Sequence, residues 1–463
     1  MQKKHYLCTR KGFMSTICAI STAYGTGGIA VIRVSGEQAV PIADSLFSGR
    51  ISLRDAKSGT VHFGKIERAN GRTDERAKEV LDEVLCSVFR APHSFTGEDT
   101  VEIACHGSLY IQQELLRWLI DAGCRAAEPG EFTRRAFLNG KMDLTQAEAV
   151  ADLIAAQSKA EKDLALSQLR GSVSNELTAL RERLLHFTSL IELELDFADH
   201  EELEFADRTE LNSLAAEIET KLAALMTSFR TGNAIRNGIP VAIIGAPNVG
   251  KSTLLNALLG EQRAIVSDIQ GTTRDTIEDT LVIDGILFRL IDTAGLRDTD
   301  DRLENMGIER SRQVAEKAQI VIWMSDANDA TSASEPLHDI RGTVIRVRNK
   351  ADLMASGVRN QEAGLYISAK KGEIEPLRRE LVRVARESMQ TSAVMLSNVR
   401  HYEAVSRAHE AIVRVQQGLA DGLSGELLSL DLQDCLAALG EVTGQITNTE
   451  VLTNIFSKFC IGK

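Results

Sequence analysis

The sequence predicts a multidomain protein of mixed α/β and all-α architecture, in which a Ras-like P-loop domain is inserted into a helical domain that follows an α+β domain. Three observations predict this fold class. Short β-rich runs separated by glycine turns fill residues 14 to about 140. Apolar residues at helical spacing follow to about residue 229 and return after residue 396. Between them stand a strand, a glycine-rich loop and a helix, an order that suits anion binding at a helix N-terminus.

Composition limits the class of protein. A chain of 463 residues has room for about two to four domains. Its 53 Lys and Arg against 65 Asp and Glu give a net charge of −12, which argues against nonspecific coating of nucleic acids but not against a local basic face. The 7 cysteines are scattered without a CxxC pair, so we expect neither a disulfide framework nor a zinc site, and a reducing cytoplasm as the compartment.

The sequence contains neither a membrane span nor a secretory signal. No apolar run approaches the roughly 18 residues that a spanning helix needs. Residues 1–13 are basic but lack the apolar core of a signal peptide. We expect these residues to be a disordered extension or a misassigned start before Met14.

The first domain, residues 14–140, is expected to be α+β. Tyr110–Leu119 has the apolar spacing of a helix. The glycines of Gly25–Gly28 allow a second nucleotide loop as an alternative, but no Lys-Ser follows and no GxGxxG spacing holds, which favours a turn. The expected strands are Ile17–Ile20, Ile29–Val34, Val84–Phe89 and Thr100–Cys105.

A helical domain is expected from residues 141–237 and 396–463. Thr145 and Glu148 have the spacing of a capping box at its first helix. The acidic tract at residues 196–202 is interpreted as a solvated loop, with a metal site as the less favoured alternative. Insertion of another domain between the two parts is cheap, because domain termini usually lie close together at the surface.

The inserted domain, residues 238–395, contains the P-loop pattern. The apolar run Val241–Ile244 leads into Gly245–Ser252, and an apolar helix follows. Backbone N–H groups of such a loop point at an anion, for which phosphate is the natural occupant. Lys251 would reach the outer phosphates, and the Ser252 hydroxyl would ligate a phosphate-bound magnesium ion.

Later segments supply the other parts of a guanine-nucleotide site. Leu287–Ile291 runs into Asp292-Thr293-Ala294-Gly295, where a carboxylate can hold the magnesium shell and a glycine N–H can meet the γ-phosphate. A strand at 344–347 ends in Asn349-Lys350-Ala351-Asp352, where the carboxylate of Asp352 can accept two hydrogen bonds from guanine but not from adenine. Ser368-Ala369-Lys370 fits the loop that closes over the base.

Two further segments of this domain have structural roles. Ile320–Met324 is expected to be a strand without chemistry of its own. Residues 281–288 read as a hairpin closed by an Asp284-Gly285 turn. The parallel sheet should therefore carry one antiparallel edge strand.

The residues that turn over the phosphate differ from the Ras-like pattern. Leu296 follows Gly295, and an apolar side chain cannot position the attacking water. The amide oxygen of Asn248 could instead help to hold a monovalent cation against the phosphates. Glu304 is a candidate for orienting the attacking water, although sequence composition alone favours an ordinary carboxylate on the surface of a helix. Thr273, in the switch segment 265–275, would ligate magnesium only when the γ-phosphate is present.

Three markers resemble the bacterial tRNA-modification GTPase family MnmE (TrmE). They are Gly271–Asp275, Pro129–Phe137 and the terminal Cys460–Lys463, and the resemblance runs from Ile17 to the last residue. It implies an N-terminal tetrahydrofolate-binding and dimerisation domain at 14–140, similar to the aminomethyltransferase of glycine cleavage. It also implies a helical domain split in sequence and an inserted GTPase domain.

The resemblance implies an activity and partners. Hydrolysis of GTP would be coupled to addition of an aminomethyl or carboxymethylaminomethyl group at C5 of the wobble uridine of certain tRNAs. The implied partners are a second copy of the chain and the FAD-dependent protein MnmG (GidA), in a heterotetramer. The implied cofactors are potassium, magnesium and 5-formyl- or 5,10-methylene-tetrahydrofolate.

The resemblance also assigns residues. It makes Glu304 the water-orienting glutamate, together with Asn248, Thr272 and Thr273 as catalytic residues, which reverses the interpretation from composition. The role of Cys460 stays open, with a buried free thiol as the alternative. Potassium ligands are Asn248, Ser267, Ile269 and Thr272, magnesium ligands are Ser252 and Thr273, and folate contacts are Arg33, Glu102, Lys141 and Lys463. The GTP contacts are Asn248, Val249, Gly250, Lys251, Ser252, Thr253, Ser267, Asp268, Ile269, Gln270, Gly271, Thr272, Thr273, Asp292, Thr293, Ala294, Gly295, Asn349, Lys350, Ala351, Asp352, Ser368, Ala369 and Lys370.

A second class of function shares the same nucleotide domain. The chain could be a GTP-dependent switch in RNA or ribosome assembly, without covalent chemistry. Such a switch needs neither a folate-type N-terminal domain nor the terminal Cys-Ile-Gly-Lys. These two features favour the enzyme.

Overall fold

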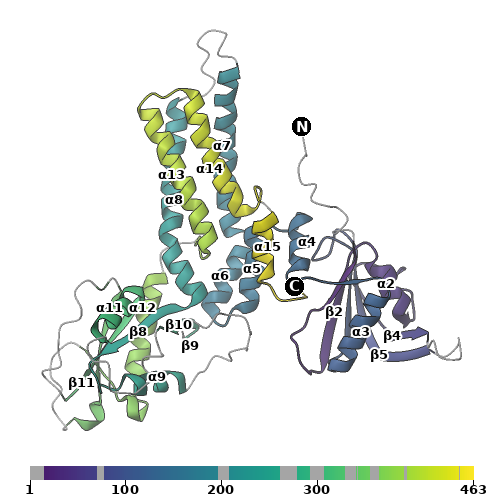
Figure 1. Cartoon of the computed structure of the whole chain (residues 1–463), viewed down its shortest axis with the longest axis horizontal. Helices are drawn as coiled ribbons and strands as arrows, with labels where there is room; N and C mark the ends of the chain where they lie inside the picture. The colour runs from purple at the N-terminus through teal and green to yellow at the C-terminus, as the bar shows by residue number, and fades with distance from the viewer. Residues whose placement is uncertain are drawn as a thin grey trace. The chain divides into compact units, whose positions relative to one another are not determined.

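The structure is a computed structural model that divides into two compact units (Figure 1). One unit consists of Met1–Glu148 with Gly444–Lys463, and the other of Ala149–Thr443. The structure describes residues 15–69, 78–196, 208–260, 279–291, 307–328, 340, 342–354, 364–389, 394–447 and 449–462.

The first unit is built on a 7-stranded sheet in the order β3-β4-β5-β6-β2-β1-β7. Alternate residues of β2, such as Ala30, Ile32 and Val34, are buried against α2 (Ala39–Leu46) and α3 (Leu109–Asp121). This confirms the expected strands and the helix near 110–119. The strands are β1 (Ile17–Ile20), β2 (Ile29–Ser35), β3 (Phe47–Gly49), β4 (Thr60–Ala69), β5 (Lys78–Phe89), β6 (Thr100–His106) and β7 (Arg125–Ala126).

The opposite face of this sheet is partly apolar and exposed. One row across it contains Phe63, Leu85, Ala104 and Val31, which pair successively on β4, β5, β6 and β2. Phe63 is 63% and Leu85 47% exposed. The next position on this face of β2 is Arg33, which pairs with Glu102 of β6. A polar site therefore borders an exposed apolar row.

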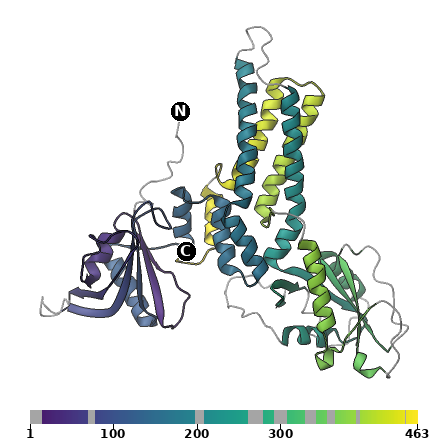
Figure 2. The ribbon, with the colours of Figure 1, turned by 180° about the vertical axis from the view of Figure 1, so that it is seen from behind.

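The second unit contains a bundle of long helices. In Figures 1 and 2, α7 (Ser172–Asp196), α8 (Arg208–Asn237), α13 (Val399–Ala420) and α14 (Gly425–Thr443) lie side by side. Buried leucines at helical spacing, such as Leu177, Leu180 and Leu184 of α7, form its core with the facing helices. Two shorter helices precede the bundle in the chain, α5 (Leu144–Ala155) and α6 (Lys159–Leu169).

The start of α5 differs from its prediction. Asp143 accepts a hydrogen bond from the Gln146 N–H at 2.9 Å, and the Gln146 side chain accepts one from the Asp143 N–H at 3.0 Å. The reciprocal capping box is therefore Asp143 with Gln146, and the predicted pair Thr145 and Glu148 is wrong. Thr145 donates its hydroxyl to Asp143 at 2.7 Å instead.

The inserted domain contains a 6-stranded sheet in the order β13-β12-β11-β8-β10-β9. Among the described strands of this sheet only β9 pairs antiparallel, at the edge, which confirms the expected hairpin. The strands are β8 (Ile239–Gly245), β9 (Asp279–Ile283), β10 (Ile286–Leu290), β11 (Ile320–Asp326), β12 (Thr343–Asn349) and β13 (Leu365–Tyr366).

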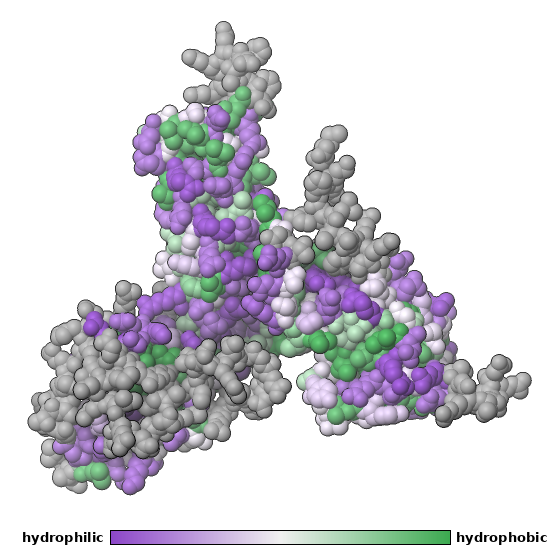
Figure 3. All heavy atoms as spheres, in the orientation of Figure 1, coloured by the Kyte–Doolittle hydropathy of each residue, from purple (hydrophilic) through white to green (hydrophobic). Residues whose placement is uncertain are grey.

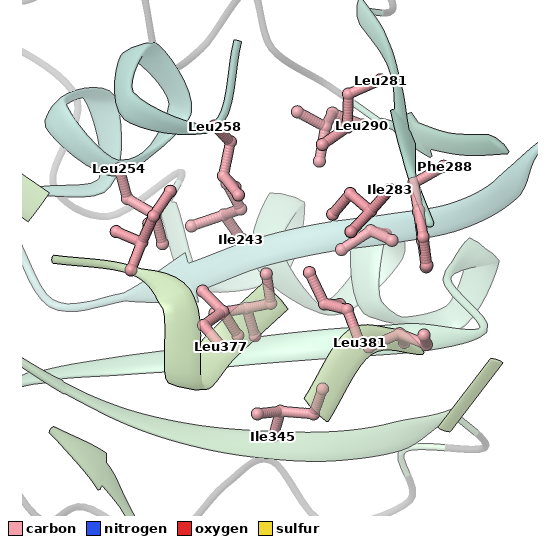
Figure 4. Packing of buried hydrophobic residues seen from close by; sticks show 14 of the residues in the cluster. Ile243, Leu254, Leu258, Leu281, Ile283, Phe288, Leu290, Ile345, Leu377 and Leu381 are labelled. Carbon is pink, nitrogen blue, oxygen red and sulfur yellow. The ribbon is translucent and has the colours of Figure 1, made fainter. Parts of the chain in front are cut away.

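Helices cover both faces of this sheet. Ile243 packs with Leu254 of α9 (Lys251–Gly260) and Leu377 of α12 (Glu375–Met389) in the core that Figure 4 shows. Its neighbour Ile244 packs in a separate cluster with Ala315 of α11 (Gly307–Lys317). Residues buried on both faces explain why β8 reads as a continuous apolar run.

The C-terminal segment belongs to the first unit. It contains α15 (Thr449–Ser457), and the Gly130 N–H donates to the Cys460 carbonyl at 3.4 Å. The Ser21 hydroxyl donates to the Gly462 carbonyl at 3.1 Å. We expected this segment with the second half of the helical domain, 396–463, whose limits stay a prediction. Cys460 is exposed, unlike the buried thiol considered above.

The described helices do not have the character of membrane spans. None of them combines the length and apolarity needed to cross a lipid bilayer. On the face seen in Figure 3, hydrophobic residues of the helical bundle are interspersed with hydrophilic ones.

Candidate functional site

The P-loop connects the end of β8 to the start of α9. Gly245 lies so close to β11 that a Cβ there would be 2.3 Å from the Met324 carbonyl oxygen. Lys251 lies across the loop and donates to the carbonyls of Gly245 and Ala246 at 2.8 and 2.9 Å. Burial disfavours the charged form of its ammonium group and lowers its pKa. A bound anion would stabilise the charged form again.

Asn349 joins the P-loop to the loop after β13. Its side-chain amide donates to the Val249 carbonyl at 2.8 Å, and its oxygen accepts from the Ala369 N–H at 3.0 Å. Gly250 has a φ of +95°, and a Cβ on it would lie 2.4 Å from the Asn349 amide nitrogen. The close approach therefore requires glycine at this position.

Asp352 lies in a short 3₁₀ turn, Ala351–Leu353, directly after β12. The Ser368 hydroxyl donates to its carboxylate at 2.7 Å, and this hydrogen bond lowers the pKa of Asp352. The carboxylate is therefore ionised near neutral pH and acts only as an acceptor, as recognition of guanine N–H groups requires.

Lys350 has an ion pair that sequence reasoning missed. Its ammonium lies 2.8 Å from a carboxylate oxygen of Asp326, at the end of β11. That strand was expected to carry no chemistry. The signal available was an aspartate at the carboxyl end of an apolar parallel strand, which brings it to the edge of the sheet where the loops meet.

Parallel pairing brings these groups together. Strands β8, β11, β12 and β13 run in one direction, so their carboxyl ends share one edge of the sheet. Ser252 and Thr253 start α9 at this edge, and the Asn248 side chain is exposed on the loop, whose φ there is 61°. Several predicted contacts lie outside the described residues: Ser267, Asp268, Ile269, Gln270, Gly271, Thr272, Thr273, Asp292, Thr293, Ala294, Gly295, Glu304 and Lys463.

A second polar site lies in the first unit, around Arg33. The Arg33 Nε donates to Glu102 at 2.9 Å, and Nη2 lies 2.8 Å from the same carboxylate oxygen. The guanidinium carbon is 5.4 Å from the ring centre of Phe95 and 5.5 Å from that of Phe132, within the range of cation–π attraction. These two aromatic residues were missed from sequence, although Phe132 lies in the marker 129–137.

Lys141 reaches the same part of the unit through one short segment. Its ammonium donates to the Pro92 carbonyl at 2.9 Å, and Asn139 donates to the Thr96 carbonyl at 2.8 Å. Phe95, which contacts Arg33, lies between those two carbonyls in sequence. Segment 92–96 thus contacts two of the four predicted folate contacts, Arg33 and Lys141, and Arg33 in turn pairs with Glu102.

The fold and the first of these sites define the class of the chain. A phosphate loop and an Asn-Lys-x-Asp loop at one edge of a parallel sheet make it a P-loop guanine-nucleotide-binding protein. Two family models match it: the MnmE helical domain over residues 144–460, and the GTP-binding protein TrmE N-terminus over residues 16–141. The chain belongs to the MnmE family of tRNA modification GTPases.

Individual relatives match along nearly the whole chain. It is 54% identical to the tRNA modification GTPase MnmE of Parabacteroides distasonis, over 97% of this chain and 100% of that protein. The proteins of the same name from Bacteroides fragilis and Flavobacterium johnsoniae are 52% and 48% identical, each over 97% of this chain and 99% of the relative. Among solved structures, the G domain of the T. maritima FeoB iron transporter is 25% identical with a TM-score of 0.24, over 32% of this chain and 98% of that chain.

Proposed function

We propose that this chain is a potassium-dependent GTPase that hydrolyses GTP to GDP and phosphate in the modification of tRNA. With the flavoprotein MnmG it would add an aminomethyl or carboxymethylaminomethyl group at C5 of the wobble uridine, using a one-carbon unit from tetrahydrofolate. The observation that carries the GTPase part is the hydrogen-bonded connection from Val249 through Asn349 to Ala369. It fixes the spacing between the phosphate loop and the base loop.

Different residues of the chain would bind the phosphates and the base of GTP. Amides of the P-loop and the ammonium of Lys251 would hold the phosphates. Lys251 can leave its two carbonyl acceptors for a phosphate because a phosphate carries a full negative charge, which adds ion–ion attraction to the hydrogen bond. Asp352, held by Ser368, would accept from the guanine edge. Glu304 would orient the attacking water.

Two cations fit the residues at the P-loop. Magnesium would be held by Ser252 and Thr273, and potassium by Asn248 with Ser267, Ile269 and Thr272. The exposed side chain of Asn248 supports this, because within the described residues its amide oxygen is not committed to a hydrogen bond. Together the cations would supply positive charge where the β–γ bond breaks.

The Arg33 site suits a reduced folate. Glu102 can accept from the N–H edge of a pterin, while Lys141 and Lys463 offer cations to the glutamate tail. Arg33 and Glu102 neutralise each other, so the pair favours a neutral polar edge over a free anion. The half-exposed ring of Phe95 adds a stacking surface for a flat heterocycle.

Homodimerisation through the first unit is supported by its exposed apolar row. Phe63 and Leu85 lie beside Val61 and Ile29, which are 59% and 71% exposed. An exposed apolar face of this kind marks an interaction surface, and it borders the Arg33 site. The dimer would work in the cytoplasm with MnmG and tRNA.

Hydrolysis in two salts tests the cation. We expect GTP turnover in potassium chloride to exceed that in sodium chloride by at least about tenfold, because the smaller ion fits a potassium cage poorly. Glu304→Ala should abolish turnover and keep GTP affinity. Equal rates in the two salts would refute the potassium mechanism.

The competing assembly switch makes a different prediction for tRNA. Nucleoside analysis of tRNA from a strain lacking this gene should show loss of the modified wobble uridine. If the amount of modified wobble uridine is unchanged in this strain and ribosome assembly is defective, the assembly switch is favoured instead.

A further inference from the structure

The marker segment 129–137 has no role in the proposed function. This segment forms the turn before α4 (Glu131–Leu138) and the helix itself. It contacts both the Arg33 site and the C-terminal segment. The inference below rests on the proposed folate site and concerns how that site is held.

One side of this helix supports Arg33. Phe132 is fully buried, and its ring is one of the two that flank the Arg33 guanidinium. Within the described residues the guanidinium pairs with Glu102 through Nε and Nη2, which leaves Nη1 for a ligand. The direction of Nη1 therefore depends on where Phe132 and Phe95 hold the guanidinium plane.

The start of the same helix supports the C-terminal segment. Gly130 has a φ of +65°, and a Cβ there would lie 2.7 Å from the Phe456 carbonyl oxygen and 3.0 Å from Phe459 Cβ. The Gly130 N–H also donates to the Cys460 carbonyl. Phe456 and Phe459 are buried, with ring centres 5.4 Å apart. The segment 456–460 thus rests directly on a residue without a side chain.

The segment then continues toward the strand beside Arg33. Gly462 lies so close to the end of β1 that a Cβ on it would be 2.1 Å from the Ile20 carbonyl oxygen. Ile20 and Ala19 pair with Ile32 and Arg33 of β2. The C-terminal segment therefore touches the surroundings of Arg33 at both ends, through α4 and through β1.

Buried charges make the helix a rigid connection. Arg135 donates to Glu131 at 2.9 Å and to Glu98 at 3.1 Å, and the Glu128 N–H donates to Glu131 at 2.9 Å. Both Glu131 and Arg135 are almost completely buried. A displacement at Gly130 would therefore be transmitted along the first turn rather than absorbed in it.

We propose that Gly130 and Phe132 are positioning residues of the folate site. The C-terminal segment seated on Gly130 fixes the first turn of α4, and this turn holds Phe132 against Arg33. This contact of the C-terminal segment with Gly130 holds Arg33 in one orientation toward the ligand. Displacement of the segment releases the guanidinium and weakens recognition of the pterin edge.

Two alanine variants of the full chain test the proposal. Gly130→Ala places a methyl group against the seated segment. Gly140→Ala is its matched control, because Gly140 has a similar φ of +70° but nothing within 4 Å of its Cβ position. We expect Gly130→Ala to raise the Kd for 5-formyltetrahydrofolate, measured by calorimetry, by ~10-fold or more, and Gly140→Ala to leave it unchanged.

A second pair of variants separates positioning from bulk packing. Phe132→Leu keeps an apolar side chain but removes the ring that flanks Arg33, and should raise the same Kd. Phe137→Leu makes the same change on the same helix and should not. Phe95→Leu should weaken binding, and Phe95→Tyr should restore it, because the ring face is kept.

Hydrogen–deuterium exchange distinguishes failure of this inference from failure of the folate site. In Gly130→Ala, without ligand, the peptides covering 456–462 and 91–98 should both exchange faster than in Gly140→Ala, while those of β4 and β5 stay protected. Faster exchange in 456–462 alone, with an unchanged Kd, would overturn the inference, as would equal losses in both variants. If the parent chain binds no folate, the proposed folate function fails, and the exchange of 91–98 still decides the connection.

Discussion

The nucleotide site and the Arg33 site differ in how far apart in the chain their residues lie. The P-loop is one continuous segment, and its partners follow at the ends of parallel strands of the same sheet. The Arg33 site combines β2, β6, the segment 92–96, α4 and the C-terminal segment. In that segment, Gly462 accepts a hydrogen bond from Ser21, which lies 441 positions away in sequence. The first site uses backbone groups whose geometry the strand ends set, while the second uses side chains held by packing.

The difference teaches where each site is vulnerable. Backbone amides stay in place when a neighbouring side chain is changed. The nucleotide site is therefore sensitive mainly to the few charged side chains that contact the ligand, such as Lys251 and Asp352. A guanidinium between two rings moves when either ring moves, so the second site depends on residues that never touch a ligand. Three predictions test this contrast.

The largest effect is expected for Lys251→Ala. Removing the cation that faces the phosphates should lower GTP turnover by ~10²–10³. The Kd for 5-formyltetrahydrofolate should not change, because this lysine belongs to the other unit. Phosphate release from GTP measures the first effect, and calorimetry with the folate measures the second. A parallel loss of folate affinity would show that the two sites are not independent.

A buried charge in the first unit should have the next largest effect. Glu131→Gln breaks a buried ion pair with Arg135 and a second pair with the partly exposed Arg125, and should destabilise the first unit by about 3–5 kcal/mol in urea unfolding at pH 7. Glu128→Gln is the control, because its pair with Arg134 is largely exposed and is worth about 0–1 kcal/mol. Equal losses would contradict the role of burial.

The pH dependence of the same contribution has a definite sign. Burial opposes ionisation of Glu131, but hydrogen bonds from Arg125, the Glu128 N–H and Arg135 lower its pKa below the ordinary value of 4.5. A lowered folded-state pKa gives stability that is present above the unfolded pKa and lost as pH falls through the folded one. The difference between parent and Glu131→Gln should therefore shrink as the pH falls below the ordinary value of 4.5.

The smallest effect is expected for Asp326→Asn in the nucleotide site. Its pair with Lys350 is partly exposed, so its loss should weaken GTP binding less than tenfold. Glu375→Gln, which breaks an exposed pair with Arg379 on α12, should change nothing. A loss of GTP binding of tenfold or more would show that this pair does more than orient the base loop.

The sequence by itself determined most of the nucleotide domain. Its strands, its hairpin and its P-loop are local patterns, because apolar periodicity and glycine spacing act over a few residues. Asp352 and Lys251 could be assigned without coordinates for the same reason. The start of α5 was misassigned by two residues, since Asp143 and Thr145 both have cap chemistry and only the folded turn selects between them.

Only the tertiary structure decided the rest. Nothing in the neighbourhood of Phe95 or Phe132 in sequence indicates that they meet Arg33. The strand end at Asp326 places it at the loop edge of the sheet but does not indicate that its partner is Lys350. The same holds for Gly130, whose missing side chain leaves room for the backbone of Phe456 to approach closely. Such contacts are set by the pairing of strands and by the packing of the two chain ends, and they join residues from 24 positions apart, as in Asp326 and Lys350, to 326 positions apart, as in Gly130 and Phe456. A linear pattern carries no record of that distance.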